Sequence, residues 1–214
     1  MDAMVDLFWS FRSPYSYLAM PGALRIEQDF RVRVRFRPVL PLAVRDPSFF
    51  SPDNLKRAKY IRLDWPRRGE MLGVPHAWPS PDPIVQDMKT YEIASEQPYI
   101  YRLTYLGVEA ERRGRGLAFA YEVSHLLFSG TRDWHLGEHL SQAAQRAGLE
   151  LASMDAAIAD PATHRATVDE NQKALTNAGH WGVPTFVFEG EPFFGEDRID
   201  TLRWRLGKHQ LQRN

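Results

Sequence analysis

The 214-residue sequence contains no cysteine, so the protein cannot carry out dithiol–disulfide exchange with groups of its own. Proteins without disulfides are typical of reducing compartments, and we expect a cytoplasmic protein. Long apolar runs are also missing: no stretch approaches the roughly 18 residues of a membrane helix. The N-terminus carries Asp2 and Asp6 beside one short apolar run, so we expect no signal peptide.

An excess of either charge is missing as well. Lys plus Arg and Asp plus Glu both number 27, which gives a formal net charge of zero. A sequence-independent nucleic-acid binder needs a positive face, so this class is disfavoured. No internal repeat or low-complexity tract is present. A length of 214 residues with 43% hydrophobic residues is enough for one large domain or two small ones.

The first 38 residues predict a β-α-β unit. Residues 5–11 form an apolar run typical of a buried strand, and residues 14–29 have an apolar helical face. Residues 31–37 alternate strictly between Arg and apolar side chains and end at Pro38. A helix between two strands allows the crossover that a parallel pair requires.

The middle of the chain has almost no strand signal. Residues 38–53 contain four prolines and predict an irregular connection, followed by a helix over 55–72 with a kink or break at Trp65–Pro66. Residues 73–83 form a second proline-rich loop. We expect several helices with short turns over residues 84–178.

Strand signals return at the end of the chain. Residues 183–188 predict a strand, 189–191 a hairpin turn, 192–194 a second strand, and the residues after Arg198 a helix. Strands at both ends with helices between them predict an α/β fold whose sheet is built from the two termini.

The most informative motif is S-P-Y-S at residues 13–16, between the first strand and the first helix. A hydroxyl at a helix N-terminus, beside free backbone N–H groups, can hold an anion or a thiolate from another molecule. Ordinary helix capping is the alternative for Ser13 and Ser16. We expect Ser13 to be functional and Ser16 to be structural, and we expect Tyr15 and Tyr17 to pack rather than to catalyse.

Three motifs together suggest a family. They are F-R-S-P-Y-S-Y-L at residues 11–18, G-H-W-G-V-P-T-F at 179–186 and F-F-G-E-D-R-I at 193–199. With them the chain resembles the 2-hydroxychromene-2-carboxylate isomerases and the kappa-class glutathione transferases, in the DsbA-like branch of the thioredoxin superfamily. The resemblance implies a thioredoxin-like domain from residues 1–44 and 179–214, with an all-helical domain inserted over 45–178.

The resemblance also implies glutathione as the cofactor, held by Ser13, Val183, Pro184, Asp197 and Arg198. The Val183–Pro184 bond should be cis, which turns the Val183 backbone outward to pair with the cysteinyl residue like an added strand. Asp197 and Arg198 should contact the γ-glutamyl end, whose ammonium and carboxylate suit an acid and a cation.

In this family the thiolate adds to an unsaturated hydroxychromene carboxylate. Ring opening, bond rotation and release of the thiolate then give trans-o-hydroxybenzylidenepyruvate, so glutathione is not consumed. The implied partner is an aromatic carboxylate from aromatic degradation, and the implied assembly is a homodimer. Two alternatives stay open: a kappa-like glutathione transferase, and a non-catalytic thioredoxin-like binding protein of a different functional class.

One loop departs from the family pattern. Family members commonly carry a Gly-Asn-Pro-Pro-like loop after the second strand, whereas residues 45–54 here are R-D-P-S-F-F-S-P-D-N. Asn54 is the candidate equivalent of the family asparagine. The aromatic residues in or near the proline-rich loops either cover an aromatic substrate or pack in the core. They are Phe49, Phe50, Trp65 and Trp78.

Two further motifs have ordinary alternatives. H-L-G-E-H at residues 135–139 matches an inverted zinc-peptidase signature, in which His135 and His139 share a helix face and Glu138 is the base. The zinc-site hypothesis requires a third ligand on another helix. The alternative is that the segment is an exposed helix face. The basic run at residues 112–116 predicts a solvated loop or a helix end.

Overall fold

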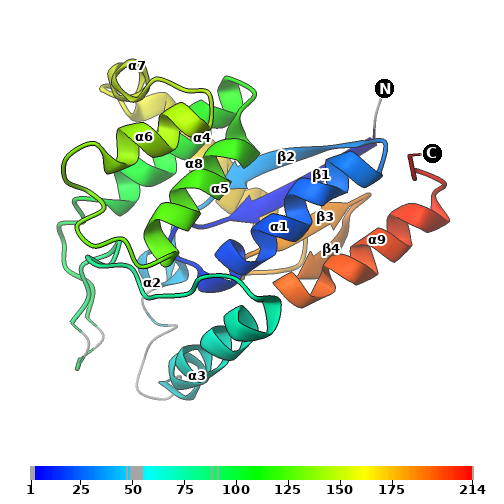
Figure 1. The fold of residues 1–214 in the computed structure, drawn as a ribbon, viewed down its shortest axis with the longest axis horizontal. Coiled ribbons are helices and arrows are strands. Elements are labelled where there is room, and N and C mark those ends of the chain that lie inside the picture. Colours follow the sequence, from blue (N-terminus) through cyan, green and yellow to red (C-terminus); the bar gives the residue numbers. More distant parts are fainter. Residues whose placement is uncertain (1–2, 47, 49–54, 88, 91, 214) are drawn as a thin grey trace.

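The computed structural model describes residues 3–46, 48, 55–87, 89–90 and 92–213. Its centre is a four-stranded sheet in the order β2-β1-β3-β4. β1 and β2 are parallel, while β1–β3 and β3–β4 are antiparallel. The sheet therefore combines both ends of the chain, as the sequence predicts (Figure 1). The strands are β1 Ala3–Trp9, β2 Val32–Pro38, β3 Thr185–Phe188 and β4 Glu191–Phe194.

Helices cover the sheet and fill the space beside it. In Figure 1, α1 and α9 lie across the front of the sheet, and the helices of the middle segment gather at its left. α3 projects below them. The helices are α1 Pro14–Asp29, α2 Leu42–Arg45, α3 Leu55–Leu72, α4 Ile100–Arg112, α5 Gly116–Phe128, α6 His139–Arg146, α7 Leu151–Ala157, α8 Ala162–Asn177, the 3-10 helix η3 Glu196–Arg198 and α9 Ile199–Lys208.

The alternation in β2 has the expected structural result. Val32, Val34 and Phe36 are buried, whereas Arg33 and Arg35 between them are exposed. Successive side chains of a strand point to opposite faces, so one face of β2 joins the core and the other faces solvent. This confirms the strand predicted from the pattern of arginines.

The core continues from the sheet into the helices of the middle segment. Phe11, which follows β1, contacts Phe36 of β2 edge to face at 6.3 Å and Phe119 of α5 at 5.9 Å. Edge-to-face contacts of this kind add to the stabilisation from burial alone. The division into domains 1–44 with 179–214 and 45–178 stays a prediction.

The prediction of helices from residue 84 is wrong for residues 84–99, because α4 begins only at Ile100. Two features stop an earlier helix. The Gln97 amide donates to the Val85 carbonyl at 2.9 Å and accepts from its N–H at 2.8 Å, which fixes an irregular path. Pro98 also disfavours helical geometry at the residue before it. By contrast, α3 passes Pro66 without a break.

Two other features concern the middle segment. In the basic run at residues 112–116, Arg112 ends α4, residues 113–115 form the turn after it and Gly116 begins α5, so a helix end and a loop are present as predicted. Within the residues described, no helix is both long and apolar enough to cross a membrane.

Candidate active site at the N-terminus of α1

Ser13 is the N-cap of α1, with extended backbone geometry and Pro14 in the first turn. Its Oγ accepts a hydrogen bond from the Ser16 N–H at 3.2 Å, so the capping interpretation is correct. The same hydroxyl also donates to the carbonyl oxygen of Val183 at 3.3 Å. The O–H can turn from this carbonyl to a ligand while the oxygen still accepts from the Ser16 N–H, so capping and a functional role are compatible.

Val183 lies in the loop that leads into β3, and the Val183–Pro184 peptide bond is cis. The Pro184 carbonyl accepts from the Gly195 N–H at 2.9 Å, which ties this loop to the segment after β4. In the part of the chain that the structure describes, the Val183 N–H donates no hydrogen bond. An extended ligand can therefore pair with this N–H in the manner of an added strand.

The His180 imidazole supports the loop before β3. The Gly182 N–H donates to His180 Nδ1 at 2.9 Å, and the His180 ring stacks on Phe194 with centroids 3.9 Å apart. Burial lowers the pKa of His180, which favours the neutral ring that can accept this bond. A Cβ at Gly182 would lie 2.5 Å from the Phe194 ring, so only glycine fits there.

The segment after β4 brings three charged residues to the same place. Asp197 and Arg198 form an ion pair at 3.3 Å, and more than half of each side chain is exposed. Glu196 is buried and receives two hydrogen bonds from Arg68 of α3, at 2.6 and 2.9 Å. These bonds raise the pKa of Arg68. They fasten α3 to the segment that carries Asp197 and Arg198.

A second polar contact fastens α3 to the first turn of α1. The Tyr15 hydroxyl donates to Asp64 Oδ2 at 2.8 Å, and the Tyr60 hydroxyl donates to Asp64 Oδ1 at 3.2 Å. Burial and then the bond to Asp64 raise the pKa of Tyr15. The phenol therefore stays protonated and remains a donor.

Tyr17 behaves differently from Tyr15 and packs in the core as predicted. It is 6% exposed, stacks on Phe128 at 5.3 Å, and donates to the Pro75 carbonyl at 2.7 Å. Burial raises its pKa to about 12. Its hydroxyl is a structural donor, whereas Tyr15 lies at the edge of a cleft.

That cleft has a volume of about 1350 Å³ and is bounded by α1, α2, α3, the loop before β3 and the segment after β4. Ser13, Val183, Asp197 and Arg198 all line it, so the structure brings together these residues from distant parts of the chain. Ser16, in the first turn of α1, is completely buried, as expected for a structural residue. Pro184 is buried and does not line the cleft.

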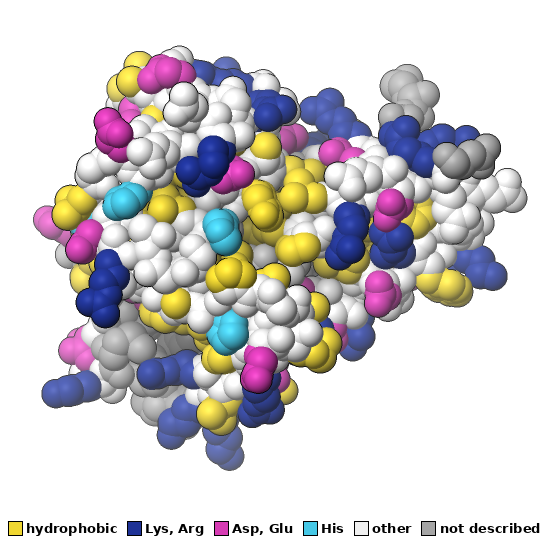
Figure 2. Space-filling model, in the orientation of Figure 1, with side chains coloured by type: hydrophobic (Ala, Val, Ile, Leu, Met, Phe, Trp, Pro, Cys, Tyr) yellow, Lys and Arg dark blue, Asp and Glu magenta, His cyan; other side chains and the backbone are white. Residues whose placement is uncertain are grey.

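Positive charge predominates around the cleft. Its lining includes seven Lys and Arg residues and four Asp and Glu residues. Dark-blue side chains gather along the lower part of the molecule in Figure 2, where α3 lies in Figure 1. A concave surface with excess positive charge attracts anions. The cations are Arg12, Arg45, Lys56, Arg57, Arg62, Arg68 and Arg198.

The aromatic residues singled out in the sequence divide into two groups. Trp65 and Trp78 both line the cleft; Trp65 is 5% exposed and Trp78 is 37% exposed. Trp65 is therefore mainly a core residue, while Trp78 presents its ring to solvent. Phe49, Phe50 and Asn54 lie outside the described residues.

The zinc-peptidase alternative is wrong on geometry. α6 begins at His139, so His135 lies in the preceding turn and the two do not share a helix face. His135 instead packs against Tyr99, with ring centroids 4.9 Å apart. Among the residues that the structure describes, no cluster of three His, Asp or Glu side chains could hold a metal ion.

A sequence model of the DSBA-like thioredoxin domain matches residues 4–207. The chain belongs to the DsbA-like thioredoxin family. Its four-stranded sheet with a long helical insertion agrees with that assignment, and S-P-Y-S occupies the start of α1. This member differs from a dithiol enzyme because it has serines at residues 13 and 16 and no cysteine elsewhere.

Curated relatives match the chain over nearly its whole length. A 2-hydroxychromene-2-carboxylate isomerase of Pseudomonas putida is 22% identical, covering 96% of this chain and 95% of the relative. Glutathione S-transferase kappa 1 of Rattus norvegicus is also 22% identical, covering 96% and 91%. The chain is thus similar to an isomerase and to a transferase at the same level.

Solved structures give the same fold. A 2-hydroxychromene-2-carboxylate isomerase structure aligns with a TM-score of 0.71 at 19% identity, covering 96% of this chain and 95% of the other. The cytosolic disulfide reductase DsbM from Pseudomonas aeruginosa with GSH aligns with a TM-score of 0.59 at 16% identity, covering 95% and 99%. These similarities establish the arrangement of α1, the sheet and the helical segment.

Sequence reasoning missed the residues that hold α3 over the cleft. Arg68 and Glu196 are 128 residues apart, and Tyr15 and Asp64 are 49 apart. No local pattern marks such pairs. The sequence did offer one signal that α3 faces a ligand, namely its run of basic residues, since an amphipathic helix rich in Lys and Arg commonly faces an anionic partner.

Proposed function

We propose that this protein is a glutathione-dependent isomerase that converts 2-hydroxychromene-2-carboxylate, or a similar aromatic acid, to its ring-opened trans isomer. The observation that carries the proposal is the position of Ser13. Its hydroxyl caps α1, lies 3.3 Å from the Val183 carbonyl and lines a cleft with excess positive charge. The similarity to isomerases of this name supports the same conclusion.

The residues present fit glutathione. The Val183 N–H is free among the described residues and suits the peptide part of the tripeptide. Asp197 and Arg198 supply opposite charges for an ammonium and a carboxylate. Drug-sized ligands occupy pockets of roughly 300–1000 Å³, so a cleft of about 1350 Å³ has room for glutathione and a second molecule.

When bound, glutathione would supply a thiolate that adds reversibly to the unsaturated substrate and is released unchanged. Ser13 favours the charged form of that sulfur when its O–H turns from the Val183 carbonyl and donates to the thiolate instead, with help from the positive end of α1. A hydrogen bond to a charged group contributes about 1.5–3 kcal/mol. This corresponds to a decrease of roughly one to two units in the pKa of the bound thiol.

Two other functions share parts of this account. A kappa-like glutathione transferase is favoured by the equal identity to the rat kappa enzyme. That reaction needs the same thiolate site but leaves sulfur on the product. A non-catalytic binding protein would use the Val183 backbone to hold a peptide and would need no second ligand in the cleft.

Product analysis separates the three functions. Purified protein is incubated with 2-hydroxychromene-2-carboxylate and glutathione, and both compounds are quantified by chromatography. The proposal predicts formation of the trans isomer with glutathione undiminished and no product without glutathione. Consumption of glutathione in proportion to product would indicate a transferase, and no turnover with isomerase or transferase substrates would indicate a binding protein.

A further inference from the structure

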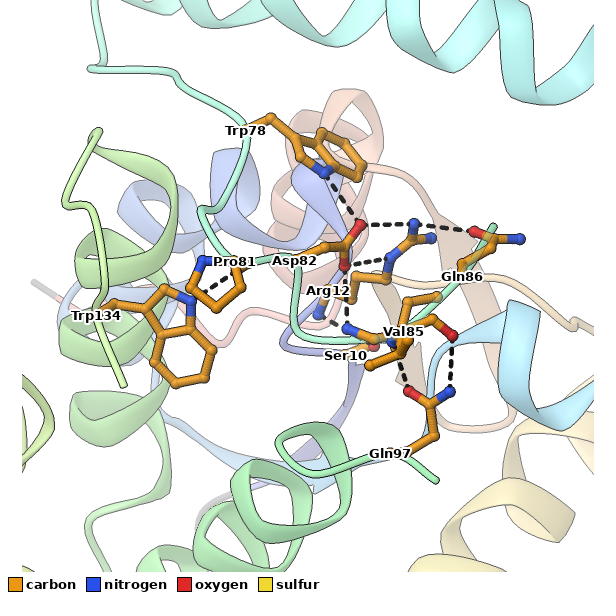
Figure 3. A network of polar contacts seen from close by, with 10 residues as sticks. Ser10, Arg12, Trp78, Pro81, Asp82, Val85, Gln86, Gln97 and Trp134 are labelled. Atoms are coloured by element: carbon orange, nitrogen blue, oxygen red, sulfur yellow. Dashed lines mark hydrogen bonds and ion pairs between the residues drawn. The ribbon is translucent and has the colours of Figure 1, made fainter. Parts of the chain in front are cut away.

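Arg12, the residue before Ser13, makes an ion pair with the loop between α3 and α4. Its Nε and Nη2 atoms donate to Asp82 Oδ1 and Oδ2, both at 2.9 Å, and Nη2 also donates to Gln86 Oε1 at 3.2 Å (Figure 3). The Arg12 side chain is only 11% exposed. A two-bond contact of this kind fixes both position and orientation.

Asp82 connects this pair to an aromatic ring. The same carboxylate accepts from Trp78 Nε1 at 3.1 Å and from the Ile84 N–H at 3.1 Å. The Arg12 guanidinium also lies 5.3 Å from the centre of the Trp78 ring. The indole is thus held at its edge by a hydrogen bond and on a face by a cation–π contact.

The loop is anchored from behind as well. Trp134 Nε1 donates to the Pro81 carbonyl at 2.7 Å, and the Gln97 side chain makes two hydrogen bonds to the Val85 backbone (Figure 3). These contacts attach residues 81–85 to two further segments. The loop therefore forms a preorganised wall of the cleft.

This wall is the aromatic side of the cleft. Arg12, Trp78, Ile84 and Gln86 all line it. The Trp78 ring makes edge contacts with Trp65 at 6.0 Å and with Phe128 at 6.3 Å, yet remains 37% exposed. An exposed, firmly held indole is a flat surface for stacking. Because Asp82 neutralises Arg12, the cation acts here by holding the wall.

We propose that Arg12 and Asp82 are positioning residues that hold Trp78 as the specificity-determining surface for a planar aromatic second ligand. The inference rests on the proposed function, because it gives the second ligand its place beside the glutathione site. It adds the residues that would select a planar ring in that ligand and the contacts that hold them in place. Val183, Asp197 and Arg198 belong to other segments and should bind glutathione independently of this wall.

The test measures two ligands separately by calorimetry. 2-Naphthoate is the planar probe, titrated with and without the unreactive S-methylglutathione, and cyclohexanecarboxylate is the non-planar comparator; glutathione is titrated in parallel. The variants are Trp78→Ala, Asp82→Asn, Arg12→Met and Arg12→Lys. The matched control is Asp155→Asn, which breaks the two-bond Arg102–Asp155 pair of α4 and α7, outside the cleft.

We expect the first three variants to bind 2-naphthoate at least tenfold more weakly, with glutathione affinity changed less than twofold. Arg12→Lys should fail to restore binding, because lysine keeps the charge but cannot make the two-bond contact. Trp78→Ala should also lose the preference for 2-naphthoate over cyclohexanecarboxylate. The control should match the wild type. In turnover, KM for the aromatic acid should rise while kcat changes less than threefold.

Unchanged 2-naphthoate binding in Trp78→Ala would overturn the inference. Wild-type 2-naphthoate binding in Arg12→Lys would overturn it as well. Equal weakening of glutathione and 2-naphthoate in Asp82→Asn would assign the pair to the general architecture of the cleft, which also overturns it. Failure of the proposed function has a different signature. In that case the wild type binds no glutathione, whereas the 2-naphthoate titration without thiol still compares the variants.

Discussion

The Ser13 hydroxyl donates a hydrogen bond to the Val183 carbonyl at 3.3 Å, although 170 residues separate the two along the chain. This contact joins the N-terminus of α1 to the loop before β3. It places a hydroxyl, a helix N-terminus and a backbone N–H that has no acceptor among the described residues along the lining of one cleft. Neither segment supplies all of these groups alone, and together they suit the thiol-containing peptide that we propose as the cofactor.

Replacing Ser13 by alanine should affect the bound thiol more than the binding of glutathione. Loss of one hydrogen bond to the thiolate should raise its pKa by roughly one to two units and slow turnover by about tenfold or more. Thiolate absorbance near 240 nm, recorded against pH with glutathione bound, measures the pKa. Calorimetry measures the affinity.

Ser16→Ala is the matched control for Ser13→Ala, since Ser16 lies in the first turn of the same helix but is completely buried. It should leave the thiol pKa unchanged. An equal loss of affinity and turnover in Ser13→Ala would indicate that Ser13 only positions glutathione. No effect on either would remove Ser13 from the mechanism.

The Arg68–Glu196 pair should respond unequally to removal of its two partners. The Glu196 side chain is 7% exposed and that of Arg68 is 26% exposed. Arg68→Met leaves a buried carboxylate without its partner and should cost about 3 kcal/mol of unfolding free energy. Glu196→Gln leaves an arginine that reaches water and should cost about 1 kcal/mol. Urea unfolding of both variants measures the difference.

Both variants should also weaken glutathione binding, because the pair holds α3 against the segment that carries Asp197. If Glu196→Gln destabilises the protein more than Arg68→Met, the burial argument is incorrect. If neither variant changes glutathione affinity, α3 contributes nothing to that part of the cleft.

Gly195→Ala should disturb the candidate glutathione site through Asp197. Gly195 has φ +104°, and a Cβ there would lie 2.5 Å from Asp197 Oδ1. Gly190 also has a positive φ, +83°, but a Cβ there meets no atom within 4 Å. Both alanine variants should lose about 1–2 kcal/mol of stability from the backbone conformation. Only Gly195→Ala should also lose glutathione affinity, as measured by calorimetry. Equal affinity in the two variants would exclude a role for Asp197.

Glu111, at the end of α4, should make stability depend on pH. Burial is the main cause that raises its pKa from an ordinary value of 4.5 to about 7. Between these values the folded chain binds more protons than the unfolded chain, so the free energy of unfolding falls as pH rises from 4.5 to 7. Above pH 7 the contribution of Glu111 to the free energy of unfolding no longer changes with pH.

Glu111→Gln removes that titration and should be more stable than the wild type at pH 8. The advantage should be about 1–2 kcal/mol at pH 8 and should shrink towards pH 5. Urea unfolding at the two pH values tests this. The same difference at both would show that Glu111 is not the titrating group.

Local sequence patterns correctly predicted the elements whose signals lie in residues close together along the chain. The alternating arginines of β2 and the S-P-Y-S motif at α1 each depend on residues close in sequence, and both were placed correctly. The helix prediction failed at residues 84–99, where Gln97 and Val85 form a cross-loop contact that no periodicity shows. A hydrophobic count cannot distinguish such a segment from a helix.

Part of the candidate site could also be predicted from local sequence motifs. Ser13, Val183, Asp197 and Arg198 lie in motifs and all line the cleft. Arg12 could not be assigned, since its partner Asp82 is 70 residues away and an isolated arginine usually faces solvent. Such pairs form only when the folded chain brings distant segments together, so no local sequence pattern predicts them.

Glutathione binding decides whether this cleft is a glutathione site. Calorimetric titration of the wild type and of Asp197→Ala, at up to millimolar glutathione, compares the complete site with one that lacks the Asp197 carboxylate. We expect one binding site per chain in the wild type and an affinity at least several-fold lower in the variant. No heat of binding in the wild type at millimolar glutathione would show that the cleft does not hold glutathione.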